Sequence, residues 1–259
     1  MEPYTHLAFS IHDHTARIVL NRPPVNALNR EFIGELTAVS SRLRTDDSVY
    51  VVALSSALPV FCAGADLKER AFLPDGDVGP AVRDIQSMVR SWCALPQPLV
   101  VQIAGAAMGG GLEFALAGDI IIASDDAQLG FPELRLGIIP AAGGTQLLAR
   151  RTNLGVAKKW IFTGIKFSGT QAARDGVVDT VVDSSDIQTA FEHIIASLSS
   201  QSPLALRQAK KAINEGFGLP LSEALDVEHA CYEPLIHTRD RREALQAFLE
   251  KREPVWTGT

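Results

Sequence analysis

The stretch "MGGGLEFALAGD" (Met108–Asp119) decides how this chain folds, because three glycines precede a strongly apolar helical run that contains one carboxylate, Glu113. An exposed helix face would place polar residues three and four positions from Glu113. Those positions instead hold Gly109, Gly110, Leu116 and Ala117. Close packing of a helix on a strand is an alternative reason for the glycines. A buried carboxylate is costly or carries a raised pKa, so Glu113 is predicted to serve a function.

Four continuous apolar runs flank this stretch and predict strands that are covered on both faces. They are "ARIVL" (16–20), "VYVVAL" (49–54), "PLVVQIAG" (98–105) and "DIIIAS" (119–124). Helical patterns over 29–44 and 81–95 separate them, and the intervals are long enough for the crossover connections of a parallel sheet. The runs are not joined by Asn-Gly turns, which would indicate hairpins. We therefore expect a parallel α/β arrangement, with "FLPDGDVGP" (72–80) as a mobile loop.

From about residue 144 the chain changes to a succession of helical patterns, separated by glycines and prolines that act as caps and stops. The sequence thus predicts an N-terminal α/β core followed by a helical C-terminal region.

Composition excludes several classes of protein. The net charge of −6 over 259 residues argues against a nucleic-acid binder, and no apolar run is long enough to span a membrane. Three widely spaced cysteines form neither a disulfide framework nor a CxxC site, which is typical of a reducing compartment. The opening "MEPYTHLAFSIHDH" has no features of a targeting signal, so the expected location is cytoplasmic.

Other chemistries are not supported by their motifs. The glycines lack the G-x-G-x-x-G and GK[ST] spacings of nucleotide sites, and no G-x-S-x-G nucleophile elbow is present. "HDH" (12–14) could hold two metal ligands on one strand, but without a third ligand nearby an exposed turn is favoured. We expect no metal site.

A second isolated acid, Glu133, lies among apolar residues in "LGFPELRLGIIP" (129–140). A surface turn beside Arg135 is the alternative interpretation. Two carboxylates in apolar surroundings suit acid/base catalysis, because burial raises the pKa toward the working pH. The junctions "FCAGADLKER" (61–70) and "IAGAAMGGGLEF" (103–114) each end a strand in small residues and open a helix, so two unpaired N–H groups could form an oxyanion hole.

With these motifs in this order, the chain resembles the crotonase superfamily, the enoyl-CoA hydratase/isomerase group. The resemblance covers "LNRPPVNAL" (20–28) to "FLEKREP" (248–254). Two stretches, "GADLKERA" (64–71) and "HACYEPLIHTRDRREALQAFLEKREP" (229–254), look closest to the methylglutaconyl-CoA hydratase branch, which includes an AU-rich-RNA-binding member. The implied fold is α/β, a crotonase-like spiral of ββα units with a helical C-terminal region. Residues 1–200 would form the core that holds CoA and the active site, and 201–259 would serve oligomerisation and site closure in a homotrimer or a dimer of trimers (a hexamer).

The resemblance implies an enoyl-CoA hydratase of fatty acid metabolism that acts on a short or branched acyl-CoA, such as methylglutaconyl-CoA. Coenzyme A would be part of the substrate, and no separate cofactor is needed. The oxyanion hole would be the N–H groups of Ala65 and Gly110, with Glu113 and Glu133 as the acid/base pair. An isomerase, or another crotonase-type lyase or hydrolase, is the alternative within this fold, and a catalytically silent CoA- or RNA-binding protein is the alternative outside it.

The same resemblance implies a set of substrate-binding residues along the chain. They are Val25, Ala27, Ala63, Asp66, Leu67, Lys68, Ala141, Phe248 and Lys251. Two positions depart from the family pattern: Pro24 and Val25 stand where many members have a lysine, and Ala141 stands where glycine is usual. The stretch that would bind RNA, 29–47, sums to −1, so we expect no nucleic-acid partner.

Overall fold

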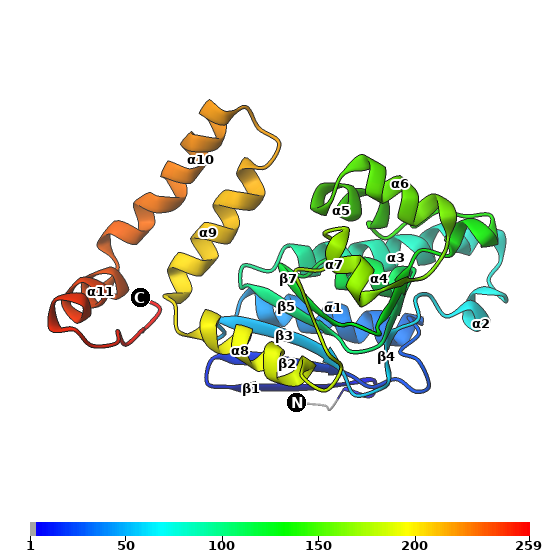
Figure 1. Ribbon diagram of the computed structural model, residues 1–259, viewed down its shortest axis with the longest axis horizontal. Coiled ribbons are helices and arrows are strands. Elements are labelled where there is room, and N and C mark those ends of the chain that lie inside the picture. Colours follow the sequence, from blue (N-terminus) through cyan, green and yellow to red (C-terminus); the bar gives the residue numbers. More distant parts are fainter. Residues whose placement is uncertain (1–3) are drawn as a thin grey trace.

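The structure is a computed structural model that describes residues 4–259, so the first three residues of the N-terminal stretch lie outside it. Six strands form the main sheet, in the order β1-β2-β3-β5-β7-β10 (Figure 1). Their bounds are Leu7–His12 (β1), Thr15–Leu20 (β2), Val51–Ser56 (β3), Leu99–Ile103 (β5), Ile120–Ser124 (β7) and Thr180–Val182 (β10). Every neighbouring pair is parallel except β1–β2. The parallel sheet predicted from the apolar runs is therefore confirmed.

A second, smaller sheet has the order β4-β6-β8-β9. Its strands are only two or three residues long: Val60–Cys62 (β4), Ala106–Met108 (β6), Gln128–Gly130 (β8) and Phe167–Ser168 (β9). A strand of the main sheet, a strand of the small sheet and then a helix follow one another repeatedly along the chain, as in β3–β4–α2 and β5–β6–α4. This repetition is the predicted spiral of ββα units.

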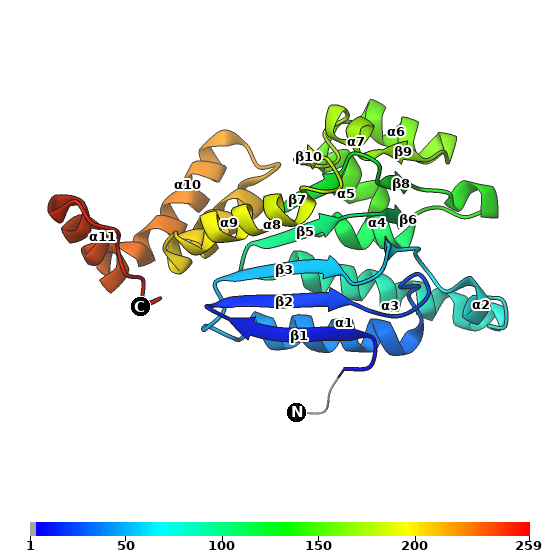
Figure 2. The ribbon, with the colours of Figure 1, turned by 60° about the horizontal axis from the view of Figure 1, so that its bottom comes forward.

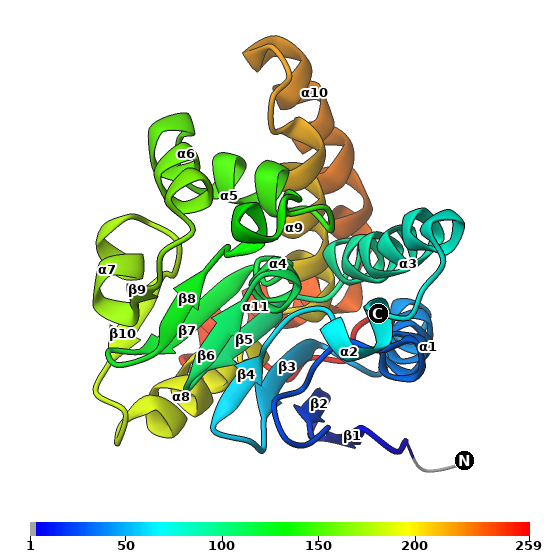
Figure 3. The same ribbon diagram turned by 90° about the vertical axis from the view of Figure 1, so that its right-hand side faces the viewer.

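Helices cover both faces of the main sheet, which explains why its strands are apolar throughout (Figure 2). Alternate residues such as Val52 and Leu54 of β3 join the core beneath α1 (Arg30–Arg44) and α3 (Asp75–Cys93). The intervening Val51 and Ala53 pack with α8 (Ile187–Ser199) on the other face. The helices α1 and α3 also lie side by side (Figure 3).

Six short helices follow the strands of the two sheets along the chain. They are α2 (Leu67–Arg70), α4 (Gly110–Ala115), η1 (Glu133–Leu136), α5 (Gly144–Arg151), α6 (Leu154–Thr163) and α7 (Gly169–Arg174). The strand-to-helix junctions predicted at 61–70 and 103–114 are present as β4–α2 and β6–α4. No helix among residues 4–259 is both long enough and apolar enough to cross a membrane.

The C-terminal helices form an arm that extends away from the sheet (Figures 1 and 2). It consists of α9 (Pro203–Gly216), α10 (Leu221–Tyr232), η2 (Glu233–His237) and α11 (Arg239–Glu250). Ion pairs join α9 to the core, from Arg207 to Asp47 at 2.5 Å and from Lys210 to Asp119 at 2.6 Å. The last residues return along the arm, where Asp240 accepts hydrogen bonds from the N–H groups of residues 257 and 258.

Two expectations about local structure are wrong. The segment 72–80 is not a loop beyond Pro74, because α3 begins at Asp75 and includes Pro80. Acidic residues in its first turn complement the helix dipole, and Pro80, the sixth residue of the helix, removes only one backbone hydrogen bond.

A hairpin is also present, between β1 and β2. Asp13 and His14 both adopt positive φ, the conformation of a tight two-residue turn, without the expected Asn-Gly pair. "HDH" is thus a turn, as favoured by the sequence, and the His14 ring stacks on Tyr50 at a centroid distance of 4.1 Å.

Candidate active site

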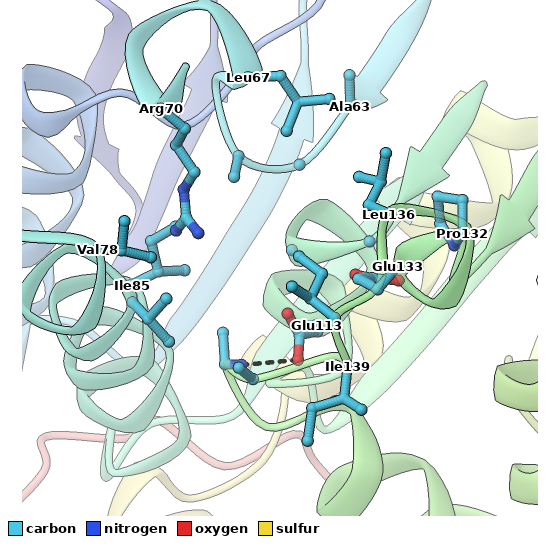
Figure 4. A pocket seen from close by; sticks show the side chains of 18 of the residues that line it. Ala63, Leu67, Arg70, Val78, Ile85, Glu113, Pro132, Glu133, Leu136 and Ile139 are labelled. Atoms are coloured by element: carbon cyan, nitrogen blue, oxygen red, sulfur yellow. Dashed lines mark hydrogen bonds between the residues drawn. The ribbon is translucent and has the colours of Figure 1, made fainter. Parts of the chain in front are cut away.

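A pocket of about 720 Å³ opens between α2, α3, the start of α4 and the segment 132–142 (Figure 4). Its volume lies in the usual range for small-molecule sites. Its side chains are mostly aliphatic, and among its described lining residues only Arg70, Glu113 and Glu133 carry charge. The other lining residues are Ala63, Gly64, Ala65, Leu67, Ala71, Val78, Val82, Ile85, Gly109, Gly110, Pro132, Leu136, Gly137, Ile138, Ile139, Ala141 and Ala142. The two glutamates are therefore brought together in one apolar cavity.

Glu113, on α4, is 3% exposed, and two backbone donors hold its carboxylate. Its Oε1 accepts hydrogen bonds from the N–H groups of Ala142 at 2.8 Å and Gly144 at 2.7 Å. Burial raises the pKa of Glu113, while these donors and the nearby charge of Arg70 act in the opposite direction. Glycine is needed at 144, because a Cβ there would lie 2.8 Å from the Phe131 ring and 3.0 Å from Cγ of Glu113.

Glu133 begins η1, and its side chain is buried, so the interpretation as a surface turn is wrong. Its Oε2 has no hydrogen-bond partner among the described residues. Burial, with a smaller contribution from the charge of Glu113, raises the pKa of Glu133 to about 7. Gly109 leaves room for this carboxylate, since a Cβ there would lie 2.7 Å from Glu133 Oε1. A carboxyl group with such a pKa is suited to proton transfer near neutral pH.

Two backbone N–H groups are available beside the glutamates. Leu28 forms a parallel bridge with Ala65 by bonding to Gly64 O and Asp66 N, so the N–H of Ala65 points away from that bridge. Gly110 is the first residue of α4, where N–H groups have no intrahelical acceptor. A Cβ on Gly110 would lie 3.6 Å from Ala65 N, which places the two N–H groups close together.

The loop that carries Val25 and Ala27 is anchored by Asn26, which is fully buried with φ of +51°. The Asn26 amide accepts from Arg22 N at 2.7 Å and donates to Ser56 Oγ at 2.8 Å and to the carbonyls of residues 60 and 61. Val25 O accepts from Ala63 N, so this loop lies directly against the strand that leads into the pocket.

Some of the remaining predicted binding residues line the pocket, and others lie on α2 beside it. Ala63, Leu67 and Ala141 line the pocket. Asp66 caps α2 by accepting from Lys68 N, and it pairs with Arg22 at 3.1 Å. Lys68 itself is exposed on α2.

Phe248 and Lys251 lie in the arm, on α11 and at its C-cap, at the opposite end of the molecule from α2 (Figures 1 and 2). One copy of the chain does not bring these two residues to its own pocket. Ala141, by contrast, lines the pocket with a φ outside the positive region, so alanine fits the position where the family usually has glycine.

The sequence analysis missed two residues that shape the site. Arg70 extends from α2 toward Val78 and Ile85 of α3 (Figure 4). Val78 lies in the segment interpreted as a loop, so its contribution to the pocket from the first turns of α3 was not expected. Asn26 also went unnoticed, although asparagine is one of the residue types that most readily adopt a left-handed conformation.

This arrangement combines two donors for an oxygen atom with two carboxylates of raised pKa. N–H donors of this kind stabilise negative charge that develops on a carbonyl oxygen. No cluster of three or more metal-ligating side chains occurs among residues 4–259.

The chain is similar to known proteins over nearly its whole length. The sequence profile described as Enoyl-CoA hydratase/isomerase matches residues 10–259. An enoyl-CoA hydratase/isomerase of Bacillus subtilis is 44% identical over 248 residues, covering 95% of both chains. The human mitochondrial methylglutaconyl-CoA hydratase is 40% identical, over 90% of this chain and 70% of its own length.

Among solved structures, an enoyl-CoA hydratase from Bacillus anthracis superposes with a TM-score of 0.95 at 39% identity, covering 98% of this chain and all of the other. A match of both sequence and fold over nearly the whole chain establishes the family. The chain belongs to the enoyl-CoA hydratase/isomerase family.

Proposed function

We propose that the protein is an enoyl-CoA hydratase that adds water to the α,β double bond of a short or branched acyl-CoA. One observation carries the proposal: Glu113 and Glu133 line the same pocket as the N–H groups of Ala65 and Gly110. Hydration needs a base for water, an acid for the α-carbon and donors for the thioester oxygen, and these four groups supply all three.

In the proposed mechanism the thioester oxygen accepts hydrogen bonds from Ala65 and Gly110. Glu113 removes a proton from water as the oxygen attacks the β-carbon, and the π electrons move to the thioester, which becomes an enolate. Glu133 then donates its proton to the α-carbon. The backbone donors that favour the ionised form of Glu113 suit a base, and the raised pKa of Glu133 suits an acid. Proton exchange between the glutamates and solvent restores the starting state.

Coenzyme A is the carrier portion of the substrate, and the reaction as proposed needs no other cofactor. We expect Val25, Ala27 and Ala63 to contact the carrier, because Val25 O accepts from the N–H of Ala63 beside the pocket, and the exposed Lys68 is available to its phosphates. We also propose a cytoplasmic location, because the three cysteines carry free thiols and a reducing compartment would keep them so.

We also propose that the chain assembles as a homotrimer or a dimer of trimers. Phe248 and Leu249 on α11 are each 80% exposed, and large apolar side chains are exposed along the rest of the arm. A monomer seldom leaves such a surface uncovered. Because Phe248 and Lys251 lie far from their own pocket, contact with a neighbouring copy is the route by which they would complete a site.

The test is loss of the ultraviolet absorbance of crotonyl-CoA, with the product identified by mass. Glu113→Gln and Glu133→Gln should each lose activity about 100-fold or more, whereas Glu228→Gln, at an exposed glutamate on α10, should not. A 3-enoyl-CoA offered in parallel distinguishes the alternative. A shift of its double bond without a mass gain, and no hydration of crotonyl-CoA, would identify an isomerase instead.

A further inference from the structure

The loop that joins η1 to α5 runs along one side of the pocket. Within the described part of the chain, its residues 139–142 make only two hydrogen bonds. The N–H of Ala142 donates to Glu113 Oε1 at 2.8 Å (Figure 4), and the carbonyl of Ala141 accepts from Nε2 of Gln86 at 3.3 Å. Both groups belong to the one peptide unit that joins Ala141 to Ala142, so this unit is bound from two sides.

Gln86 lies on the face of α3 that is turned toward the pocket and this loop. Val82 and Ile85 of the same helix line the pocket, and a Cβ on Gly143 would lie 3.8 Å from Cγ1 of Val89. Residues three, four and seven positions apart share one face of a helix, which places the Gln86 amide between the pocket wall and the loop. Gln86 itself is exposed and is not among the residues that line the pocket. An effect of its side chain on the reaction would therefore pass through the loop.

The peptide unit connects the Gln86 bond to the carboxylate. A donor at the carbonyl of a peptide polarises its N–H, and hydrogen bonds in such a chain strengthen one another. The bond from Gln86 to Ala141 O therefore makes the N–H of Ala142 a stronger donor to Glu113 and fixes its direction. Burial raises the pKa of Glu113, and backbone donors from residues 142–144 oppose this effect. Removing the amide of Gln86 would weaken one of these donors and favour protonated Glu113.

We propose that Gln86 is a positioning residue for Glu113, because its amide fixes the peptide unit whose N–H holds the carboxylate. This inference rests on the proposed function, in which Glu113 is the base that activates water. It gives α3 a second role besides that of an aliphatic wall: one of its polar side chains keeps the base ionised and correctly placed.

The kinetic test uses Gln86→Met, which keeps the length of the side chain and removes its donor. With crotonyl-CoA, kcat should fall about 5- to 10-fold, the size expected for the loss of one hydrogen bond. KM should change less than about twofold, because Gln86 does not line the pocket. The acidic limb of the pH profile of kcat should move to higher pH, since the ionised form of Glu113 loses stabilisation.

Two further variants separate positioning from packing. Gln86→Lys keeps an N–H donor of similar reach, so it should restore most of kcat and return the pH profile toward that of the wild type. Gln146→Met makes the same substitution as Gln86→Met at an exposed glutamine whose side-chain hydrogen bonds lie within α5, and it should leave both unchanged. Because Gln86 is exposed, all three variants should melt at the wild-type temperature.

A measurement without substrate separates this inference from the hydratase proposal. Infrared spectroscopy distinguishes an ionised from a protonated carboxyl group, and subtracting the spectrum of Glu113→Gln isolates the signal of Glu113. A pH titration should give a higher pKa for Glu113 in Gln86→Met than in the wild type. If crotonyl-CoA is not hydrated while this shift is found, the proposed function is wrong and the link between Gln86 and Glu113 stands.

Two results would overturn the positioning role. One is a Gln86→Met variant whose kcat, pH profile and Glu113 pKa all match those of the wild type. The other is a loss of activity that Gln86→Lys does not restore and that leaves the pKa of Glu113 unchanged, which would assign to Gln86 a role in packing or in substrate binding alone.

Discussion

Glu113 and Glu133 face the same pocket, but their carboxylates are held in opposite ways. Glu113 Oε1 accepts from two backbone N–H groups, at 2.7 and 2.8 Å, whereas Glu133 Oε2 is buried with no partner in the described part of the chain. The charge of Glu113 also helps to raise the pKa of Glu133. The two groups differ in their preference for a proton because of these surroundings, and this difference is what an acid/base pair requires.

Glu133→Gln should stabilise the free protein at alkaline pH. The pKa of Glu133 is raised from 4.5 to about 7 by folding, so the folded state binds more protons than the unfolded state between these values. The stability associated with the protonated carboxyl is fully present below pH 4.5 and is lost as the pH rises through 7. The melting temperature of Glu133→Gln should therefore exceed that of the wild type at pH 8 and converge with it near pH 4.5. A difference that does not change with pH would contradict the assigned pKa.

Gly110→Ala should reduce the activity of the protein without changing its stability. A Cβ at this position meets Ala65 N, Leu28 Cδ1 and Gly64 Cα at 3.6–3.7 Å, which is ordinary van der Waals contact, and φ is not in the positive region. The added methyl group would nevertheless lie beside the N–H of Ala65, where the thioester oxygen is expected. We predict an unchanged melting temperature and a loss of kcat of about 100-fold or more.

Gly34→Ala is the matched control for that experiment, because apart from the neighbouring backbone of its own helix no atom lies within 4 Å of a Cβ on this glycine. It should keep full activity and gain about 0.5–1 kcal/mol of stability. If Gly110→Ala keeps full activity, the N–H of Gly110 is not part of an oxyanion hole.

Asn26→Ala should destabilise the fold by about 3 kcal/mol, because a fully buried amide and its partners lose several hydrogen bonds. The positive φ of residue 26 adds to the cost. Denaturant unfolding measures this loss. Asn214→Ala, at an exposed asparagine of α9, should change the midpoint little. Equal effects of the two substitutions would show that the Asn26 network contributes nothing specific.

Phe248→Asp should weaken assembly. The arm exposes Phe248, Leu249 and other apolar side chains, and a charge placed among them would oppose burial against a neighbouring copy. Light scattering of the purified protein should show the proposed trimer or hexamer in the wild type and smaller species in the variant. Ile11→Asp, at an exposed apolar residue of β1, is the control and should leave the mass unchanged. A wild type that is monomeric at all concentrations would overturn the assembly proposal.

The parts of the fold that could be predicted are those where burial leaves a long pattern in the sequence. Runs such as 98–105 and 119–124 are apolar throughout because helices cover both faces of the main sheet. The small sheet left no such pattern, because its strands of two or three residues are too short to show a period. The β1–β2 hairpin was missed because Asp13 and His14 make its turn without glycine.

The candidate site likewise contains residues that the sequence predicted and residues that it did not. Glu113 and Glu133 were found because isolated carboxylates in apolar runs are chemically unusual. Arg70 was not, since a basic residue on a short polar helix gives no sign that its side chain points inward. That Phe248 and Lys251 lie far from the pocket of their own chain depends on the direction of the arm, which no local pattern encodes.

The pocket joins two kinds of wall, and they differ in how easily substitution can alter them. The donors at residues 65 and 110 and those that hold Glu113 belong to the main chain, so replacing most side chains nearby leaves them in place. The wall formed by Leu67, Arg70, Val78 and Ile85 consists of side chains from α2 and α3. Point mutations can therefore redesign what this scaffold accepts while the reaction centre stays intact, which makes α2 and the first half of α3 the place to begin engineering a new acyl specificity.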